Sequence, residues 1–172
     1  MRIVGGAEYV PETSIIYPTE DTERDLVLIR IINAPREKVY RCWSEPELLR
    51  QWFAPHPWST PSVEADVRPG GASLITMADE SGTEYPNPGQ YLEVVPNQKL
   101  VFTDAYIGDW QPSEKPFFTT ILLFEDIGDG RTRYTAIARH WNSEDAAAHK
   151  RMGFHEGWGI CAAQLEEVAK HL

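Results

Sequence analysis

Cysteine is scarce in this 172-residue sequence, and basic residues are fewer than acidic ones. The two cysteines, Cys42 and Cys161, are too few for a disulfide framework, and their helical, partly apolar surroundings favour buried thiols. Sixteen Lys and Arg stand against 26 Asp and Glu, which gives a formal net charge of −10. This balance argues against nucleic acid and anionic membrane surfaces as partners, because both are bound through clustered cations.

Long apolar runs are missing as well. No stretch approaches the roughly 20 apolar residues that a membrane-spanning helix needs. The first ten residues lack the basic start and the apolar run of a secretory signal. We therefore expect a cytoplasmic protein that does not insert into membranes.

Motifs that mark common catalytic and metal sites are also absent. The sequence contains no Gly-x-Ser-x-Gly, no Walker loop and no Gly-x-Gly-x-x-Gly. Its histidines form no His-x-x-x-His pair, and there is no Cys-x-x-Cys. The histidines are His56, His140, His149, His155 and His171. We expect neither a metal site nor a cofactor.

Aromatic residues, in contrast, are abundant: six Trp, seven Tyr and six Phe. Aromatic side chains bury large areas, so they indicate a rich core or a lined pocket. The length suits one domain. Residues 1–24 mix glycine, proline and acidic residues and are interpreted as an N-terminal extension, while residues 25–172 are expected to form the folded domain.

Apolar periodicity predicts the order of elements in this domain. Leu26 to Ile32 is typical of a buried strand, and Pro35 and Pro46 each suit the first turn of a short helix. Six further strands are predicted at residues 63–67, 72–78, 90–95, 99–107, 117–125 and 131–140. Their hairpin-sized connections predict antiparallel pairing. An apolar stripe after Asn142 predicts one long C-terminal helix.

Three glycines lie within this expected helix: Gly153, Gly157 and Gly159. Each costs about 1 kcal/mol relative to alanine. Close backbone packing is the preferred interpretation, and a helix softened to open a cavity mouth is the alternative.

These elements predict an α+β fold with a curved sheet. A flat seven-stranded sheet exposes more apolar surface than one helix of about 10–12 Å diameter covers. The sheet is therefore expected to curl around the C-terminal helix, with the two short helices that follow the first strand as a lid. This arrangement leaves an apolar cavity between the sheet and the helix.

Several side chains are candidates for that cavity. His140, at a strand end, and His155, at the edge of an apolar helix face, would be polar handles, although ordinary boundary histidines are commoner. Asp104 is in phase with Phe102 and could be an inward carboxylate with a raised pKa, but a solvent-facing position is preferred. The expected apolar lining comprises Trp52, Phe53, Trp58, Met77, Phe102, Tyr106, Phe118, Met152 and Trp158.

Five segments resemble one known group of proteins. They are Trp52-Phe53-Ala54-Pro55, Arg68-Pro69-Gly70-Gly71, Tyr91-Leu92-Glu93-Val94-Val95-Pro96, Leu100-Val101-Phe102-Thr103-Asp104 and Gly153-Phe154-His155-Glu156-Gly157-Trp158. Together they resemble the START-like SRPBCC superfamily, in the branch named for the activator of heat-shock protein 90 ATPase, from about Asp25 to the C-terminus. The resemblance implies the helix-grip (START/Bet v-like) fold.

The resemblance also implies a function, since such relatives bind lipids, polyketides or other apolar molecules. We expect binding of a small apolar or aromatic, lipid- or polyketide-like ligand in the internal cavity. One alternative is a cyclase- or dehydratase-like enzyme using His155, His140 or Asp104 as its acid–base group. Another is a co-chaperone-like interaction module, which is disfavoured because the eukaryotic co-chaperone has a further N-terminal domain. The sequence leaves a homodimer open.

Overall fold

The structure, a computed structural model, describes residues 18–172, so most of the expected N-terminal extension lies outside the described residues. Its strands are β1 (Asp25–Ile32), β2 (Ser59–Ala65), β3 (Ala72–Ala78), β4 (Glu84–Val95), β5 (Lys99–Thr103), β6 (Phe118–Asp126) and β7 (Thr132–His140). Its helices are α1 (Arg36–Ser44), α2 (Pro46–Leu49), α3 (Ser143–Arg151) and α4 (Phe154–Lys170).

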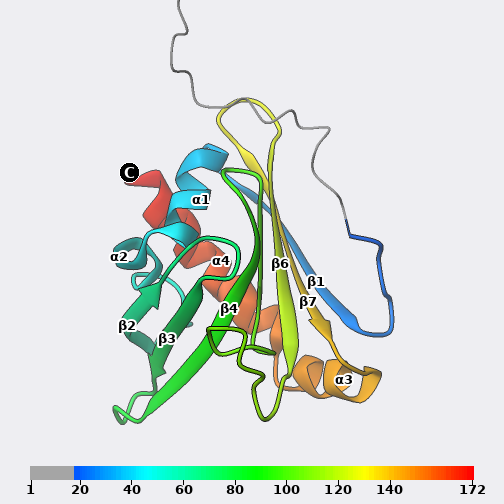
Figure 1. Ribbon diagram of the computed structural model, residues 1–172. Coiled ribbons are helices and arrows are strands. Elements are labelled where there is room, and N and C mark those ends of the chain that lie inside the picture. The colour runs from blue at the N-terminus through cyan, green and yellow to red at the C-terminus, as the bar shows by residue number, and fades with distance from the viewer. Residues whose placement is uncertain (1–17) are drawn as a thin grey trace, which may run out of the picture.

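All seven strands form one antiparallel sheet in the order β1-β7-β6-β5-β4-β3-β2. Figure 1 shows α4 crossing this sheet from the end where α3 lies to the end where α1 and α2 lie. The predicted α+β helix-grip architecture is therefore confirmed.

The two short helices begin at prolines, as the sequence predicts. Pro35 is the N-cap residue of α1, and Pro46 occupies the first position of α2, where no backbone N–H is needed. Cys42 and Trp43 of α1 are buried, and the backbone oxygen of Cys42 accepts a hydrogen bond of 3.0 Å from Nε1 of Trp52. This bond ties the chain after α2 to the core.

β4 is six residues longer than its predicted range. The prediction missed its first half because that half contains Pro86 and Pro88, which are unusual in strands. Both prolines pair with β3, whereas β5 pairs only with the second half of β4, from Gln90 onward. A proline lacks an N–H but is tolerated where a strand has one unpaired edge. β5 is shorter than predicted and ends at Thr103 rather than at residue 107. Among the described residues, the first half of β4 therefore has no partner strand on the β5 side.

The C-terminal helix is broken, which corrects the prediction of one continuous helix. α3 ends at Arg151, and Gly153 takes a left-handed conformation with φ of 92° before α4 begins. Glycine adopts this φ without the steric penalty of a Cβ atom. Asn142 caps α3, because its Oδ1 accepts a hydrogen bond of 2.8 Å from the N–H of Asp145.

The glycines of α4 do not share a packing role. A Cβ atom at Gly157 would meet nothing within 4 Å, so the preferred interpretation of close backbone packing is wrong at this position. At Gly159 it would lie 3.0 Å from Nη2 of Arg30, the movable end of a side chain. Gly157 instead borders open space.

Candidate functional site

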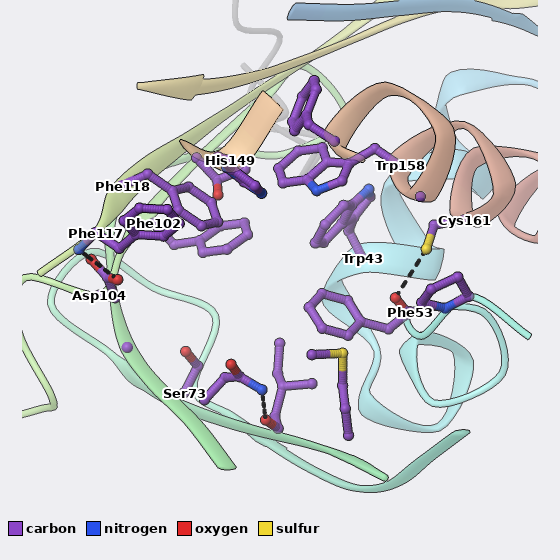
Figure 2. Close-up of a pocket in the computed structure, with 18 of the residues that line it drawn as sticks. Trp43, Phe53, Ser73, Phe102, Asp104, Phe117, Phe118, His149, Trp158 and Cys161 are labelled. Atoms are coloured by element: carbon purple, nitrogen blue, oxygen red, sulfur yellow. Dashed lines mark hydrogen bonds between the residues drawn. The ribbon is translucent and has the colours of Figure 1, made fainter. Parts of the chain in front are cut away.

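A cavity of about 470 Å³ lies between the sheet, α4 and the segment that follows α2. Residues of β3, β4, β5, β6, β7, α1, α3 and α4 line it. Figure 2 shows an open centre, with Phe102 and Phe118 on one side, Trp43 and Trp158 on the other, and Ser73 on a third. The cavity is thus enclosed by elements that are far apart in the sequence.

Aromatic rings make up much of the wall. On the helix side, the Trp43 and Trp52 rings meet edge-to-face with centroids 4.7 Å apart, and Phe53 packs on both at 6.0 Å. Trp43 also reaches Phe102 of the sheet, at 5.6 Å. Such edge and tilted contacts are favoured by the ring quadrupole and hold the wall in a defined shape.

The segment that carries Phe53 is anchored to α4. Nε2 of Gln164 donates hydrogen bonds to the backbone oxygens of Trp52 and Ala54, at 2.9 and 2.8 Å. Sγ of Cys161 donates to the backbone oxygen of Phe53 at 3.3 Å. These bonds satisfy the loop's carbonyl groups and fix one wall of the cavity.

Most of the apolar side chains expected at the cavity lie on its lining. These are Trp52, Phe53, Met77, Phe102, Phe118, Met152 and Trp158. Two of the expected residues do not line it: the Trp58 ring stacks on Tyr85 at 5.2 Å, and Tyr106 packs on Trp110 at 5.7 Å. Both lie outside regular strands and helices, so no periodicity fixed their direction.

His155 does not reach the cavity, which corrects its expected place there. Its side chain is exposed, and its ring packs on Phe154 with centroids 4.9 Å apart. The inner face of α4 instead carries Phe154, Gly157, Trp158 and Cys161, at helical spacing. His155 follows Phe154 directly and is therefore turned about 100° away from that face.

His140 lies behind the cavity wall rather than on it. Only 1% of the residue is exposed, and its Nε2 is 2.9 Å from Nδ1 of His149. His149, which sequence reasoning considered only as a metal ligand, does line the cavity. Its spacing of three residues from Ala146, on the buried face of α3, is a signal that could have identified it.

The His149 ring is enclosed by aromatic side chains. Its centroid lies 5.0 Å from that of Phe118, 5.2 Å from those of Phe117 and Phe154, and 6.2 Å from that of Trp158. Burial, together with a smaller contribution from the neighbouring His140, lowers the pKa of His149 from 6.5 to about 4. His149 is therefore neutral at pH 7.

Asp104 lies on the cavity lining and is half-buried, so the preferred expectation of a solvent-facing side chain is wrong. Its two carboxylate oxygens accept the backbone N–H of Phe117 at 3.0 and 2.9 Å. Burial raises the pKa of Asp104, and the Phe117 N–H opposes this rise by stabilising the charged form. The carboxylate thus closes the loop between β5 and β6 and borders the cavity.

Cys42 is a buried thiol, as its pattern indicates, whereas Cys161 is only partly buried and lines the cavity. Burial raises the pKa of Cys42 and of Cys161 to about 12, so both are protonated at neutral pH. Within residues 18–172, no three His, Cys, Asp or Glu side chains are placed to hold a metal ion. No helix in this range has the length and apolar character needed to cross a membrane.

Comparison with known proteins identifies the family. The family model for "Activator of Hsp90 ATPase homolog 1-like protein" matches residues 33–170. No curated protein matches the chain. A solved structure from Nitrosomonas europaea is 39% identical, with a TM-score of 0.85 over 88% of this chain and 97% of that one.

More distant structures share the fold alone. A protein from Mycobacterium smegmatis is 22% identical, with a TM-score of 0.72 over 86% of this chain and 91% of that one. An AHSA1-like protein from Aeromonas hydrophila is 17% identical, with a TM-score of 0.65 over 86% and 92%. The chain belongs to the Activator of Hsp90 ATPase homolog 1-like family, as the resemblance of its motifs predicted.

Proposed function

We propose that this protein binds a small apolar molecule with aromatic character inside the cavity. The observation that carries the proposal is the composition of the lining, in which aromatic side chains from both the sheet and the helices face one space of about 470 Å³. Ligand pockets of about 300–1,000 Å³ are typically lined in this way, with a few polar groups that orient the ligand.

The polar groups of the lining are few, and they include the carboxylate of Asp104 and the imidazole of His149. Asp104 and His149 lie on the sheet side, near Phe117 and Phe118. These two rings are partly buried, and an unpaired polar group is costly where water is largely excluded. A ligand that is mostly apolar, with a polar group at this end, matches the distribution.

Binding can be tested with a defined probe, 2-methoxynaphthalene, by calorimetry or by quenching of tryptophan fluorescence. We expect saturable binding by the wild type and weaker binding by Trp158→Ala, which removes part of the wall. Trp141→Ala is the matched control, because Trp141 is 46% exposed and does not line the cavity. Absence of binding, or equal losses in both variants, would contradict the proposal.

Acid–base catalysis on the bound molecule is a second candidate function, favoured by one observation: Asp104 and His149 both border the cavity. A desolvated carboxylate with a raised pKa can act as a general acid or base. The test is incubation with a linear polyketide-like substrate. Cyclised or dehydrated product from the wild type but not from Asp104→Asn would support catalysis, and unchanged substrate in both would contradict it.

A further inference from the structure

The two nitrogens of the His140 ring are both committed to fixed partners. Nδ1 lies 2.9 Å from the backbone oxygen of Arg24, and Nε2 lies 2.9 Å from Nδ1 of His149. A carbonyl oxygen only accepts hydrogen bonds, so Nδ1 of His140 carries the hydrogen. In the neutral ring, Nε2 of His140 then has a lone pair and accepts.

This arrangement dictates the tautomer of His149. Because Nε2 of His140 accepts, Nδ1 of His149 must be the donor in their shared hydrogen bond. A neutral imidazole has one N–H, so Nε2 of His149 carries only a lone pair. No other hydrogen-bond partner of that ring is found within residues 18–172.

The backbone around His140 holds the pair in place. The N–H of His140 also donates to the oxygen of Arg24, at 2.9 Å, so this carbonyl is bound by both the backbone and the ring of one residue. Asp25, which follows Arg24, accepts two hydrogen bonds of 2.8 and 2.7 Å from Arg139. The acceptor that sets the tautomer therefore lies directly before β1, next to the first residue pair of β1 and β7, Asp25 and Arg139.

The residue that carries this free nitrogen, His149, is 9% exposed and lines the cavity. Figure 2 shows His149 on the wall between Phe118 and Trp158. With Nδ1 directed at His140, the opposite nitrogen is the one left for the cavity. A guest that supplies a hydrogen-bond donor at this acceptor gains a hydrogen bond and is therefore favoured.

We propose that Nε2 of His149 accepts a hydrogen bond from a hydroxyl or N–H group of the ligand, and that His140 is the positioning residue that fixes this acceptor. The inference rests on the proposed function and narrows its ligand class. The ligand is an aromatic or otherwise apolar molecule with a phenol, alcohol or N–H group at the end near β6 and α3.

The tautomers can be measured without any ligand. Long-range ¹H–¹⁵N correlation spectra of the histidine rings at pH 7 distinguish Nδ1–H from Nε2–H. We expect the Nδ1–H form for both His140 and His149, and a return of His149 to the Nε2–H form in His140→Leu. An Nε2–H signal from either wild-type ring would overturn the inference, whatever the protein binds.

The ligand preference is tested with two probes that differ by one donor, 2-naphthol and 2-methoxynaphthalene. We expect the wild type to bind 2-naphthol about threefold to tenfold more tightly, the range of one net hydrogen bond. His149→Phe and His140→Leu should each abolish this preference, whereas the exposed His155→Ala should preserve it.

The outcomes separate the two claims. Equal wild-type affinities for the two probes would overturn the role of His149 while leaving the binding function intact. If neither probe binds, the proposed function fails, and the ligand preference fails with it. A preference that survives in both His149→Phe and His140→Leu would place the acceptor elsewhere.

Discussion

Filling the cavity from α4 gives a direct test of its size and role. Gly157 lines the cavity, and a Cβ atom at this position would meet nothing within 4 Å. Gly157→Leu should therefore extend a side chain into the open space without displacing the sheet. The same residue type at Gly159 would meet the guanidinium group of Arg30 instead, outside the cavity lining.

The expected magnitude follows from two contributions. Replacing a helical glycine by leucine gains up to about 1 kcal/mol of helix propensity. Each buried methylene contributes about 0.8 kcal/mol, and partial burial of the four added carbons gives roughly 1–2 kcal/mol more. We expect Gly157→Leu to raise the free energy of unfolding by about 2 kcal/mol, which raises Tm by about 4–8 °C in a domain of this size.

The assay combines thermal or urea unfolding with calorimetric titration of 2-methoxynaphthalene. Gly157→Leu should be more stable than the wild type and bind the probe at least about tenfold more weakly, because the leucine occupies its place. Gly159→Leu should share the propensity gain but retain binding. A destabilised Gly157→Leu would show that the space is not there, and undiminished binding would show that the probe binds elsewhere.

Three further predictions concern charged and titratable groups. Wild-type stability should fall relative to that of His149→Gln as the pH is lowered from 6.5 to about 4, because in this range the unfolded chain binds a proton at His149 that the folded protein does not bind. The slope is at most about 1.4 kcal/mol per pH unit. Two titratable groups lie close to this ring: His140, which is bonded to it, and Asp104, which interacts with His140. Asp104→Asn should bind 2-naphthoate about tenfold more tightly than the wild type does, because a carboxylate in the wall repels an anion. Asp25→Ala should lower the free energy of unfolding by about 2 kcal/mol, since its nearly buried carboxylate bonds twice to Arg139.

Each of these predictions has its own control. Urea unfolding at a series of pH values measures the first, and parallel pH profiles for the two proteins would contradict it. An equal gain in 2-methoxynaphthalene affinity would show that charge is not the cause in Asp104→Asn. Asp66→Ala breaks an exposed ion pair with Arg68 and should lower the free energy of unfolding by less than about 1 kcal/mol. An equal loss for Asp25→Ala would show that the buried pair of Asp25 and Arg139 stabilises the fold no more than an exposed pair does.

The sheet was largely predictable because apolar alternation and turn residues report strands directly. The first half of β4 was not predicted because it contains Pro86 and Pro88. A strand tolerates prolines when one of its edges is unpaired, and the sequence does not show which edges are paired. The sequence shows Gly153 within the expected C-terminal helix but does not show that the helix breaks there. Whether a glycine continues a helix or breaks it depends on its φ, which the surrounding packing sets.

The candidate site was predictable to the extent that regular elements carry it. Phe102, Phe118 and Trp158 lie on β5, β6 and α4, where phase fixes the direction of each side chain. Tyr106 lies in a loop, where no such phase exists. His149 was missed because its importance comes from a contact with His140, across two elements whose packing the sequence does not display.

The central claim is that the aromatic-lined cavity receives an apolar guest, and the indole N–H signals of the tryptophans test it most directly. Three tryptophans line the cavity: Trp43, Trp52 and Trp158. The three that do not are Trp58, Trp110 and Trp141. In ¹H–¹⁵N spectra recorded during titration with 2-methoxynaphthalene, the first three signals should shift and saturate together while the other three stay in place. Shifts confined to the second group, or no shifts at all, would contradict the account.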